Sequence, residues 1–309
     1  MSPAALRARL GSALEFSARV IDTPERQHTL RSTIEWSYSV LGPELQRAFR
    51  RVGVFAGPFD LAAVNAVVTE HDGSGDRVVA EADPLEVIGD LVDASGVRLA
   101  EGADSEPRFR VLQTIAAFAR DKLAEHGELD DIGRRHAQHC LVVVEAMSTG
   151  RDGATDLLAR RRIETELGNL RAALGWALGD PTQPVTSVDA APSGDDRAQM
   201  GLHLCRALSW FWYVCGYQSE GRRWLSRAVE LAGADRSDEL MGSMHMLGVL
   251  LQQDGDWEPS RTALELCLDY WRARGNASFI ARELNSLGCG HRSVGASDVA
   301  RALFEESIR

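Results

Sequence analysis

A repeat of 39 to 40 residues constrains the fold of this chain more than any other feature of its sequence. Gly216, Gly255 and Gly295 recur at that spacing, and large apolar residues stand at fixed offsets from each glycine. The recurring residues are Leu208, Leu247 and Leu287, and then Leu225, Leu264 and Phe304. A glycine between two apolar helical stretches favours a turn, so each unit is predicted to be a helical hairpin. Stacked hairpins share a core, which predicts a helical-repeat array over residues 199–309 with a truncated third unit.

Before the repeats, helices and two short strands follow one another in an order typical of a winged helix. Helical spacing, with Pro43 in a first turn and Asp60 as a cap, predicts three short helices and a fourth from Pro84. The predicted helices cover 29–41, 43–52, 61–68, 84–92 and 113–126, and the predicted strands cover 97–100 and 108–112. Residues 29–126 are therefore predicted to form a winged-helix domain with a small β hairpin.

Two further segments separate this domain from the repeats. Apolar residues at helical spacing predict long helices over 131–147 and 155–178, which make residues 127–179 a helical connector. Residues 180–198 contain three prolines and few large apolar side chains, so they cannot bury enough surface to offset the entropy of ordering. This segment is predicted to be a flexible linker, and the whole chain to be mainly α.

Composition excludes several functions. The net charge of −11 excludes a uniformly basic surface for nucleic acid. The single lysine, Lys122, follows Asp121, so the chain lacks the Gly-x-x-x-x-Gly-Lys-Ser/Thr loop and is not expected to be a self-contained P-loop ATPase. The five cysteines are scattered without Cys-x-x-Cys spacing, and no apolar stretch approaches the ~18 residues of a membrane helix. These features predict a cytoplasmic protein that does not span a membrane.

Short motifs occur in a fixed order along nearly the whole chain. They are Thr29-Leu30-Arg31, Trp36-Ser37-Tyr38, Phe49-Arg50-Arg51, Val54-Phe55-Ala56-Gly57, Leu91-Val92-Asp93, Arg108-Phe109-Arg110-Val111-Leu112, Asn169-Leu170-Arg171-Ala172-Ala173-Leu174 and Gly221-Arg222-Arg223-Trp224-Leu225. Together they resemble the large bacterial regulators of the STAND (signal-transduction ATPase) class, which includes antibiotic-regulatory and large LuxR-type members.

The resemblance implies a nucleotide-binding domain, then a winged helix, a helical connector and tetratricopeptide-like repeats, with a DNA-binding domain at one terminus. Residues 1–28 look like only the last helical segment of the nucleotide-binding region, so we expect no cofactor in this chain. ATP or ADP would bind only through the missing domain. In distant relatives a Met-His-Asp motif contacts ADP. The matching positions here are Val111, Leu112 and Gln113, so that histidine contact is not expected, although Gln113 can hydrogen-bond.

The basic residues near the start of the chain allow two interpretations. A winged helix can bind DNA, and arginines in this region support that hypothesis. The third helix, normally the one that enters a groove, contains no Arg or Lys, so direct nucleic-acid binding is not expected. We instead expect an interdomain surface that faces the missing nucleotide-binding domain. Its predicted residues are Arg26, Arg31, Arg47, Arg50, Arg51 and Gln113.

A binding groove is predicted on the repeats. In tetratricopeptide-like arrays the groove is lined by fixed positions of the first helix of each unit, and the resemblance carries these over by position. The predicted groove residues are His203, Arg206, Trp210, Tyr213, His245, Gln252, Gln253, Arg282, Asn285 and Arg292. The positions chosen in this way include three arginines and no carboxylate, which suits a protein or an anionic small molecule or peptide.

A metal site is a weaker hypothesis. His136, His139 and Cys140 have spacings that place them on one face of a predicted helix. No second cluster of ligands accompanies them, so a buried cysteine with two ordinary histidines is the preferred interpretation, and no metal is expected.

These observations predict a regulatory portion of a STAND-type transcriptional regulator, without catalytic residues. Ligand or partner binding at the repeats would be relayed through the winged helix to a nucleotide-binding domain. Two alternatives remain: a transcription factor that binds DNA through its own winged helix, and a repeat scaffold for protein–protein interaction.

Overall fold

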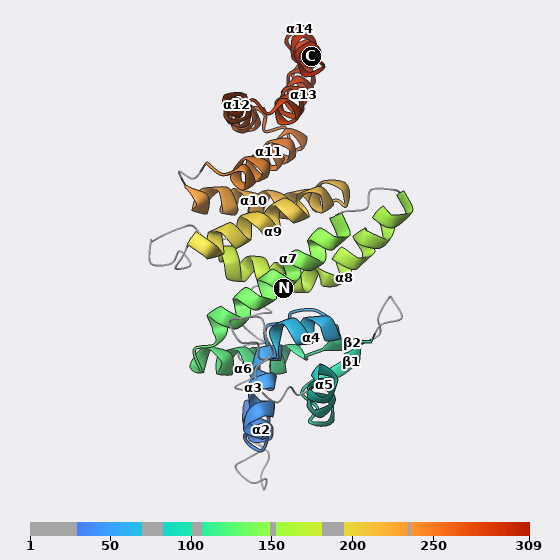
Figure 1. Ribbon diagram of the computed structural model, residues 1–309, viewed down its shortest axis with the longest axis vertical. Helices are drawn as coiled ribbons and strands as arrows, with labels where there is room; N and C mark the ends of the chain where they lie inside the picture. The colour runs from blue at the N-terminus through green and yellow to red at the C-terminus, as the bar shows by residue number, and fades with distance from the viewer. Residues whose placement is uncertain (1–29, 70–82, 101–106, 149–152, 181–194, 234–235) are drawn as a thin grey trace. The chain divides into compact units, whose positions relative to one another are not determined.

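A computed structural model describes residues 30–69, 83–100, 107–148, 153–180, 195–233 and 236–309 (Figure 1). This part of the chain contains thirteen helices and one two-stranded antiparallel sheet, so the prediction of a mainly α protein with a small hairpin is confirmed. The predicted segment 1–28 and most of the predicted linker lie outside the described residues. No helix in the described part is long and apolar enough to cross a membrane.

The chain divides into two compact units. The first comprises the described residues up to Cys140 together with Arg161–Ala173, and the second comprises Leu141–Arg160 and Leu174–Arg309. The predicted connector, 127–179, is thus shared between the two units.

The first unit contains the elements that were predicted as a winged helix, together with parts of the two helices that were predicted as the connector. The former are α2 (Leu30–Ser39), α3 (Pro43–Val52), α4 (Leu61–Val67), α5 (Pro84–Asp93), β1 (Arg98–Ala100), β2 (Arg108–Arg110) and α6 (Gln113–Glu125). The connector helices are α7 (Leu129–Ser148) and α8 (Gly153–Leu178). Local sequence sets several of their ends. Pro43 opens α3, and the Asp60 side chain caps α4 by accepting a hydrogen bond from the Ala63 N–H at 2.9 Å. Gly127, with φ of 71°, follows the end of α6.

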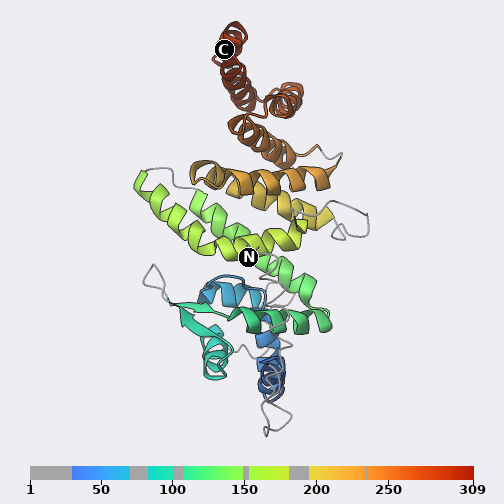
Figure 2. The ribbon, with the colours of Figure 1, turned by 180° about the vertical axis from the view of Figure 1, so that it is seen from behind.

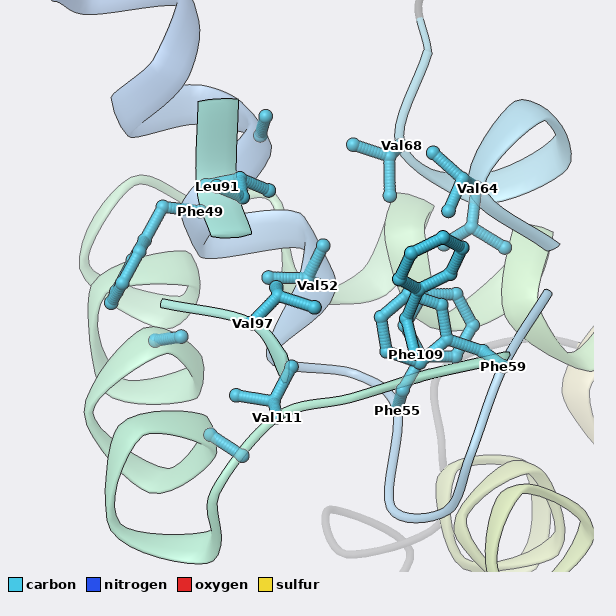
Figure 3. Close-up of a cluster of buried hydrophobic side chains, with 14 of the residues drawn as sticks. Phe49, Val52, Phe55, Phe59, Val64, Val68, Leu91, Val97, Phe109 and Val111 are labelled. Atoms are coloured by element: carbon cyan, nitrogen blue, oxygen red, sulfur yellow. The ribbon is translucent and has the colours of Figure 1, made fainter. Parts of the chain in front are cut away.

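Aromatic side chains form the centre of this unit. Phe55 stacks on Phe59 with ring centroids 4.2 Å apart, and Phe109 of β2 lies against Phe59 at 6.1 Å (Figure 3). The backbone reinforces this packing, because Phe59 and Phe109 exchange two hydrogen bonds of 2.9 and 2.8 Å. Phe118 of α6 completes the core beside Phe49. The hairpin is therefore tied to the helices through β2, while β1 pairs with β2.

The second unit contains three successive helix pairs. They are α9 (Asp195–Val214) with α10 (Gln218–Ala232), α11 (Asp238–Gln253) with α12 (Trp257–Arg274), and α13 (Ala277–Ser293) with α14 (Ser297–Ser307). Each helix packs on the next, and α11 also contacts α9 and α13 (Figures 1 and 2). Helix α9 begins at Asp195, within the segment predicted as linker.

The three repeat glycines have nearly the same conformation. Their φ angles are 84° at Gly216, 84° at Gly255 and 83° at Gly295, a region that L-residues with a side chain rarely adopt. The predicted turns at these positions are confirmed. The recurring leucines before each glycine are buried, as are Leu225 and Leu264 of the second helices.

In the second and third pairs, the glycine that follows the leucine of the first helix leaves room for the large residue of the second helix. A Cβ added to Gly248 would lie 2.9 Å from Leu264 Cγ, and one added to Gly288 would lie 2.5 Å from the Phe304 ring. The two helices of these pairs therefore approach closely only because no side chain separates them.

Candidate functional site

The predicted groove residues all lie on α9, α11 and α13, the first helix of each pair. We call these ten residues the repeat face. Because α11 packs on both α9 and α13, side chains of neighbouring helices can interact across this face.

An exposed aromatic pair lies on α9. The Trp210 side chain is 55% exposed and stacks on Tyr213, with ring centroids 5.6 Å apart and planes inclined by 25°. The intervening Phe211 and Trp212 are buried and belong to the core. An indole held in place by a stacked tyrosine offers apolar surface to a partner at little cost in side-chain entropy.

Arg206 lies one turn before this pair. Its side chain is about half exposed, and Nη1 is 3.9 Å from Glu239 Oε1 of α11. The stem runs over Gly242, where an added Cβ would contact Arg206 Cδ and Nε at 3.5 Å. The guanidinium is therefore directed from α9 toward α11 but is held only by a loose, exposed ion pair.

A buried polar network joins α11 to α13. His245 Nδ1 is 2.7 Å from Oε2 of Glu283, a residue with no exposed surface. Arg282 donates from Nε and Nη2 to the other oxygen, Oε1, at 3.3 and 3.0 Å. The Arg282 guanidinium also lies 4.5 Å above the ring centroid of Phe279. Glu283 is thus compensated on both of its oxygens, as a buried carboxylate must be.

These contacts change the charge expected for the repeat face. The positions chosen by register contain no acid, but Glu239 and Glu283 from neighbouring positions pair with Arg206 and Arg282. The remaining arginine, Arg292, lies 5.9 Å from the Phe304 ring centroid. The face is therefore mixed in charge, with Trp210 as its most exposed apolar group.

The other members of the repeat face play smaller parts. Gln252 donates from Nε2 to the carbonyl of Ser286 at 2.9 Å, which links α11 to α13. His203 is half-buried, whereas Gln253 and Asn285 are exposed.

The arginines predicted for an interdomain surface have different environments. Arg50 and Arg51 are buried, and both bind the Glu128 carboxylate; Arg51 Nε is 3.1 Å from Glu128 Oε2. Arg50 also donates to the Tyr38 hydroxyl at 3.0 Å, and Arg51 to the Val68 carbonyl at 2.9 Å. Burial by itself raises the pKa of Glu128, but hydrogen bonds from the two guanidinium groups outweigh it and the pKa is lowered. These two arginines hold the start of α7 inside the first unit.

The remaining predicted residues of that surface are more accessible. Arg31 pairs with Asp121 at 2.9 Å, Arg47 pairs with Glu44 at 3.3 Å, and Gln113 is exposed at the start of α6. Arg26 lies outside the described residues.

Asn169 is a structural centre that sequence reasoning missed. Its Oδ1 accepts hydrogen bonds from the N–H groups of Ala56 and Gly57 at 3.1 and 2.9 Å. Its Nδ2 donates to the Pro58 carbonyl at 2.8 Å and to Glu166 Oε2 at 3.0 Å. This one amide therefore fixes α8 to the turn that follows α3. The signal was present in two of the quoted motifs, one around Asn169 and one ending at Gly57, but their contact was not foreseen.

The histidine and cysteine cluster on α7 lies largely in the core. His136 is buried with its ring edge against Phe55, and Cys140 Sγ is 3.6 Å from His136 Nε2. Burial lowers the pKa of His136 to about 3 and raises the pKa of the Cys140 thiol. The described part of the chain contains no group of three or more His, Cys, Asp or Glu side chains that could hold a metal ion.

No protein-family model matches the chain. Its sequence is 31% identical over 299 residues to proteins named "Putative HTH-type transcriptional regulator", Rv0890c of Mycobacterium tuberculosis and Mb0914c of Mycobacterium bovis. The match covers 91% of this chain but 31% of each relative, so the chain spans about a third of the length of these curated relatives. An uncharacterized protein of Mycobacterium tuberculosis, Rv0894, is 30% identical over 155 residues, which is 50% of this chain and 38% of that protein.

Proposed function

We propose that this chain is a regulatory portion of a bacterial transcription regulator of the STAND class. The observation that carries the proposal is the similarity over 91% of the chain to the mycobacterial regulators, of which the chain spans 31%. The remaining length of such a regulator has room for nucleotide-binding and DNA-binding domains. On this proposal the first unit is a winged helix and the second is a tetratricopeptide-like array.

The repeat face is the proposed sensor. Trp210 and Tyr213 supply exposed apolar surface, and Arg206 lies one turn away in a loose ion pair. A partner carboxylate can replace Glu239 at Arg206 while an apolar group covers the indole. The ligand that fits this chemistry is a protein segment, or an anionic peptide or small molecule, that carries an apolar group beside an acid.

The signal would pass through α7 and α8 to the winged helix and then to a nucleotide-binding domain. Within the first unit, the four hydrogen bonds of Asn169 make α8 and the turn at Ala56–Pro58 move together. ATP or ADP would bind to the nucleotide domain only. With one lysine in the sequence and no phosphate-binding loop, the chain itself is proposed to be non-catalytic and to act in the cytoplasm.

Direct DNA binding by the first unit is the alternative. The names of the relatives support a role in transcription, which both proposals share. Helix α4, the third of the unit, has the sequence Leu-Ala-Ala-Val-Asn-Ala-Val. It contains no Arg or Lys side chain that could bind phosphates or donate paired hydrogen bonds to guanine. This composition favours the relay over the DNA-binding alternative.

Two measurements on the purified chain separate these functions. A gel shift with the promoter region of its own gene, at low and at moderate salt, is expected to show no complex with the isolated chain. ATP turnover is expected to equal the rate of a blank. A salt-sensitive complex would replace the relay with the DNA-binding alternative, and turnover by a contaminant-free preparation would refute the non-catalytic assignment.

A further inference from the structure

Two arginines face each other across the small hairpin of the first unit. The register pairs Arg98 of β1 directly with Arg110 of β2. Side chains alternate along a strand, so Arg108 lies on the same face as these two. Arg108 is buried and forms an ion pair with Glu166, whereas Arg98 and Arg110 are exposed. Among the described residues, no hydrogen bond, ion pair or ring contact involves the side chain of either exposed arginine.

This arrangement has a cost for which the described residues show no compensation. Like charges at directly opposed positions of an antiparallel pair destabilise it, because their Cβ atoms are only about 5 Å apart. Arg108 shows how the unit neutralises a cation on this face, with an acid from α8. Arg98 and Arg110 have no such acid in the described part of the chain. The contacts of the described residues therefore give no stabilising reason for an arginine at both positions.

The hairpin also has an open edge. On its far side β2 pairs with Phe59 through an isolated bridge, but in the described part of the chain β1 pairs with no strand other than β2. Leu99 follows Arg98 in β1, so its side chain points to the opposite face of the hairpin, and it is 70% exposed. The edge of β1 thus presents unpaired backbone groups, a cationic face and an apolar face.

We propose that the edge of β1 binds an extended acidic segment of a partner protein. The segment adds as a strand beside β1, with its acids on the face of Arg98 and Arg110 and its apolar side chains on the face of Leu99. Two guanidinium groups side by side can bind carboxylates through paired hydrogen bonds. The site is distinct from the repeat face and does not depend on it.

The charge of the chain favours a short protein segment over a nucleic acid. The sequence has a net charge of −11, and residues 59–107 hold twelve acidic and two basic groups, of which Arg98 is one. A phosphate polymer, which needs many cationic contacts, is disfavoured by this charge. A short protein segment needs to reach only Arg98, Arg110 and the β1 edge.

The test uses the full chain and a fluorescein-labelled, capped peptide in which Glu and Val alternate. Anisotropy is expected to report salt-sensitive binding, and the same peptide with Lys in place of Glu is expected not to bind. The double variant Arg98→Gln, Arg110→Gln should weaken binding of the Glu peptide about 2- to 30-fold, the loss expected for two exposed ion pairs. The matched control, Arg301→Gln with Arg309→Gln, removes the same charge from exposed positions of the second unit and should bind like the parent.

Two further readouts decide the matter. The thermal midpoint of Arg98→Glu should exceed that of the parent, because a repulsive cross-strand pair becomes attractive, although its binding is lost. Equal binding of the Glu peptide by the parent and the double Gln variant, or binding of the Lys peptide, would overturn the proposal. So would a lower midpoint for Arg98→Glu, since the arginines would then be structural. A labelled DNA duplex that binds the parent but not the double Gln variant would reassign the site to nucleic acid.

Discussion

Replacement of Asn169 by alanine is expected to loosen the contact between α8 and the turn after α3. The change removes the acceptor of two backbone N–H groups, those of Ala56 and Gly57, and the donor to Pro58 and Glu166. Asn169 is 3% exposed, so these groups lose their partners in a buried place. Each buried donor without an acceptor costs about 1–3 kcal/mol. Water can enter part of the space left by the amide, so we expect a loss of about 3 kcal/mol, in the lower half of the summed range.

Amide hydrogen exchange is the appropriate assay, because a chain with two units need not unfold in one step. A loss of about 3 kcal/mol corresponds to roughly a hundredfold fall in protection of the Ala56 and Gly57 amides. Amides in the core of α12 should exchange as in the parent, since α12 belongs to the second unit.

The control is Asn285→Ala, an exposed asparagine on α13. Its expected effect is within about 0.5 kcal/mol, as for most surface changes. Parental protection at Ala56 and Gly57 in the Asn169→Ala protein would refute the reasoning, because the amide would then not be holding this turn.

Three other changes test the packing and the charge network. Gly288→Ala should lower the free energy of unfolding by about 1–3 kcal/mol, because the new methyl group would clash with the Phe304 ring. The control Gly89→Ala has open space around its Cβ and should be neutral or stabilising, so equal melting temperatures for the two variants would contradict this reasoning. Glu283→Gln should lose about 1–3 kcal/mol in urea denaturation by weakening the bonds to His245 and Arg282, and an unchanged midpoint would remove the network from the account. His136 stays neutral in the folded state down to a pKa of about 3, while the unfolded state protonates it below about 6.5. Stability should therefore fall by about 1.4 kcal/mol per unit as pH drops from 6 to 4, relative to His136→Leu, and parallel pH curves for the two proteins would show the attribution to be mistaken.

Local signals in the sequence were sufficient to locate most elements. Pro43 and Asp60 open helices because a proline suits a first turn and a carboxylate accepts free N–H groups. Gly216, Gly255 and Gly295 end helices because each needs a positive φ. These effects depend on a few neighbouring residues, so the sequence alone carries them.

Partners distant in the sequence could not be found in this way. Glu128 is 77 residues from Arg51, and Asn169 is 113 residues from Ala56. Such contacts depend on how helices pack, which no local spacing specifies. As a result, Arg50 and Arg51 were assigned to a surface, although they lie inside the first unit and bind Glu128.

The repeat face was predicted with the same limits. Its residues were selected by their position within the repeat, and all of them lie on the first helix of a pair, because the repeat determines which helix contains each position. It did not foresee Glu239 beside Arg206 or the buried Glu283 beside His245, because both acids occupy positions that the register left out.

The central claim is that the repeat face controls the output of a transcription regulator, and Trp210 is its most exposed apolar group. The direct measurement is the transcript profile of the host in which the chromosomal gene carries Trp210→Ala, compared with Val299→Ala, which truncates an exposed apolar residue of α14 outside the repeat face. With protein levels equal, Trp210→Ala should change the same set of transcripts as deletion of the gene, while Val299→Ala should leave the profile as in the parent. A Trp210→Ala profile that matches the parent, or a deletion that alters no transcripts, would contradict the account.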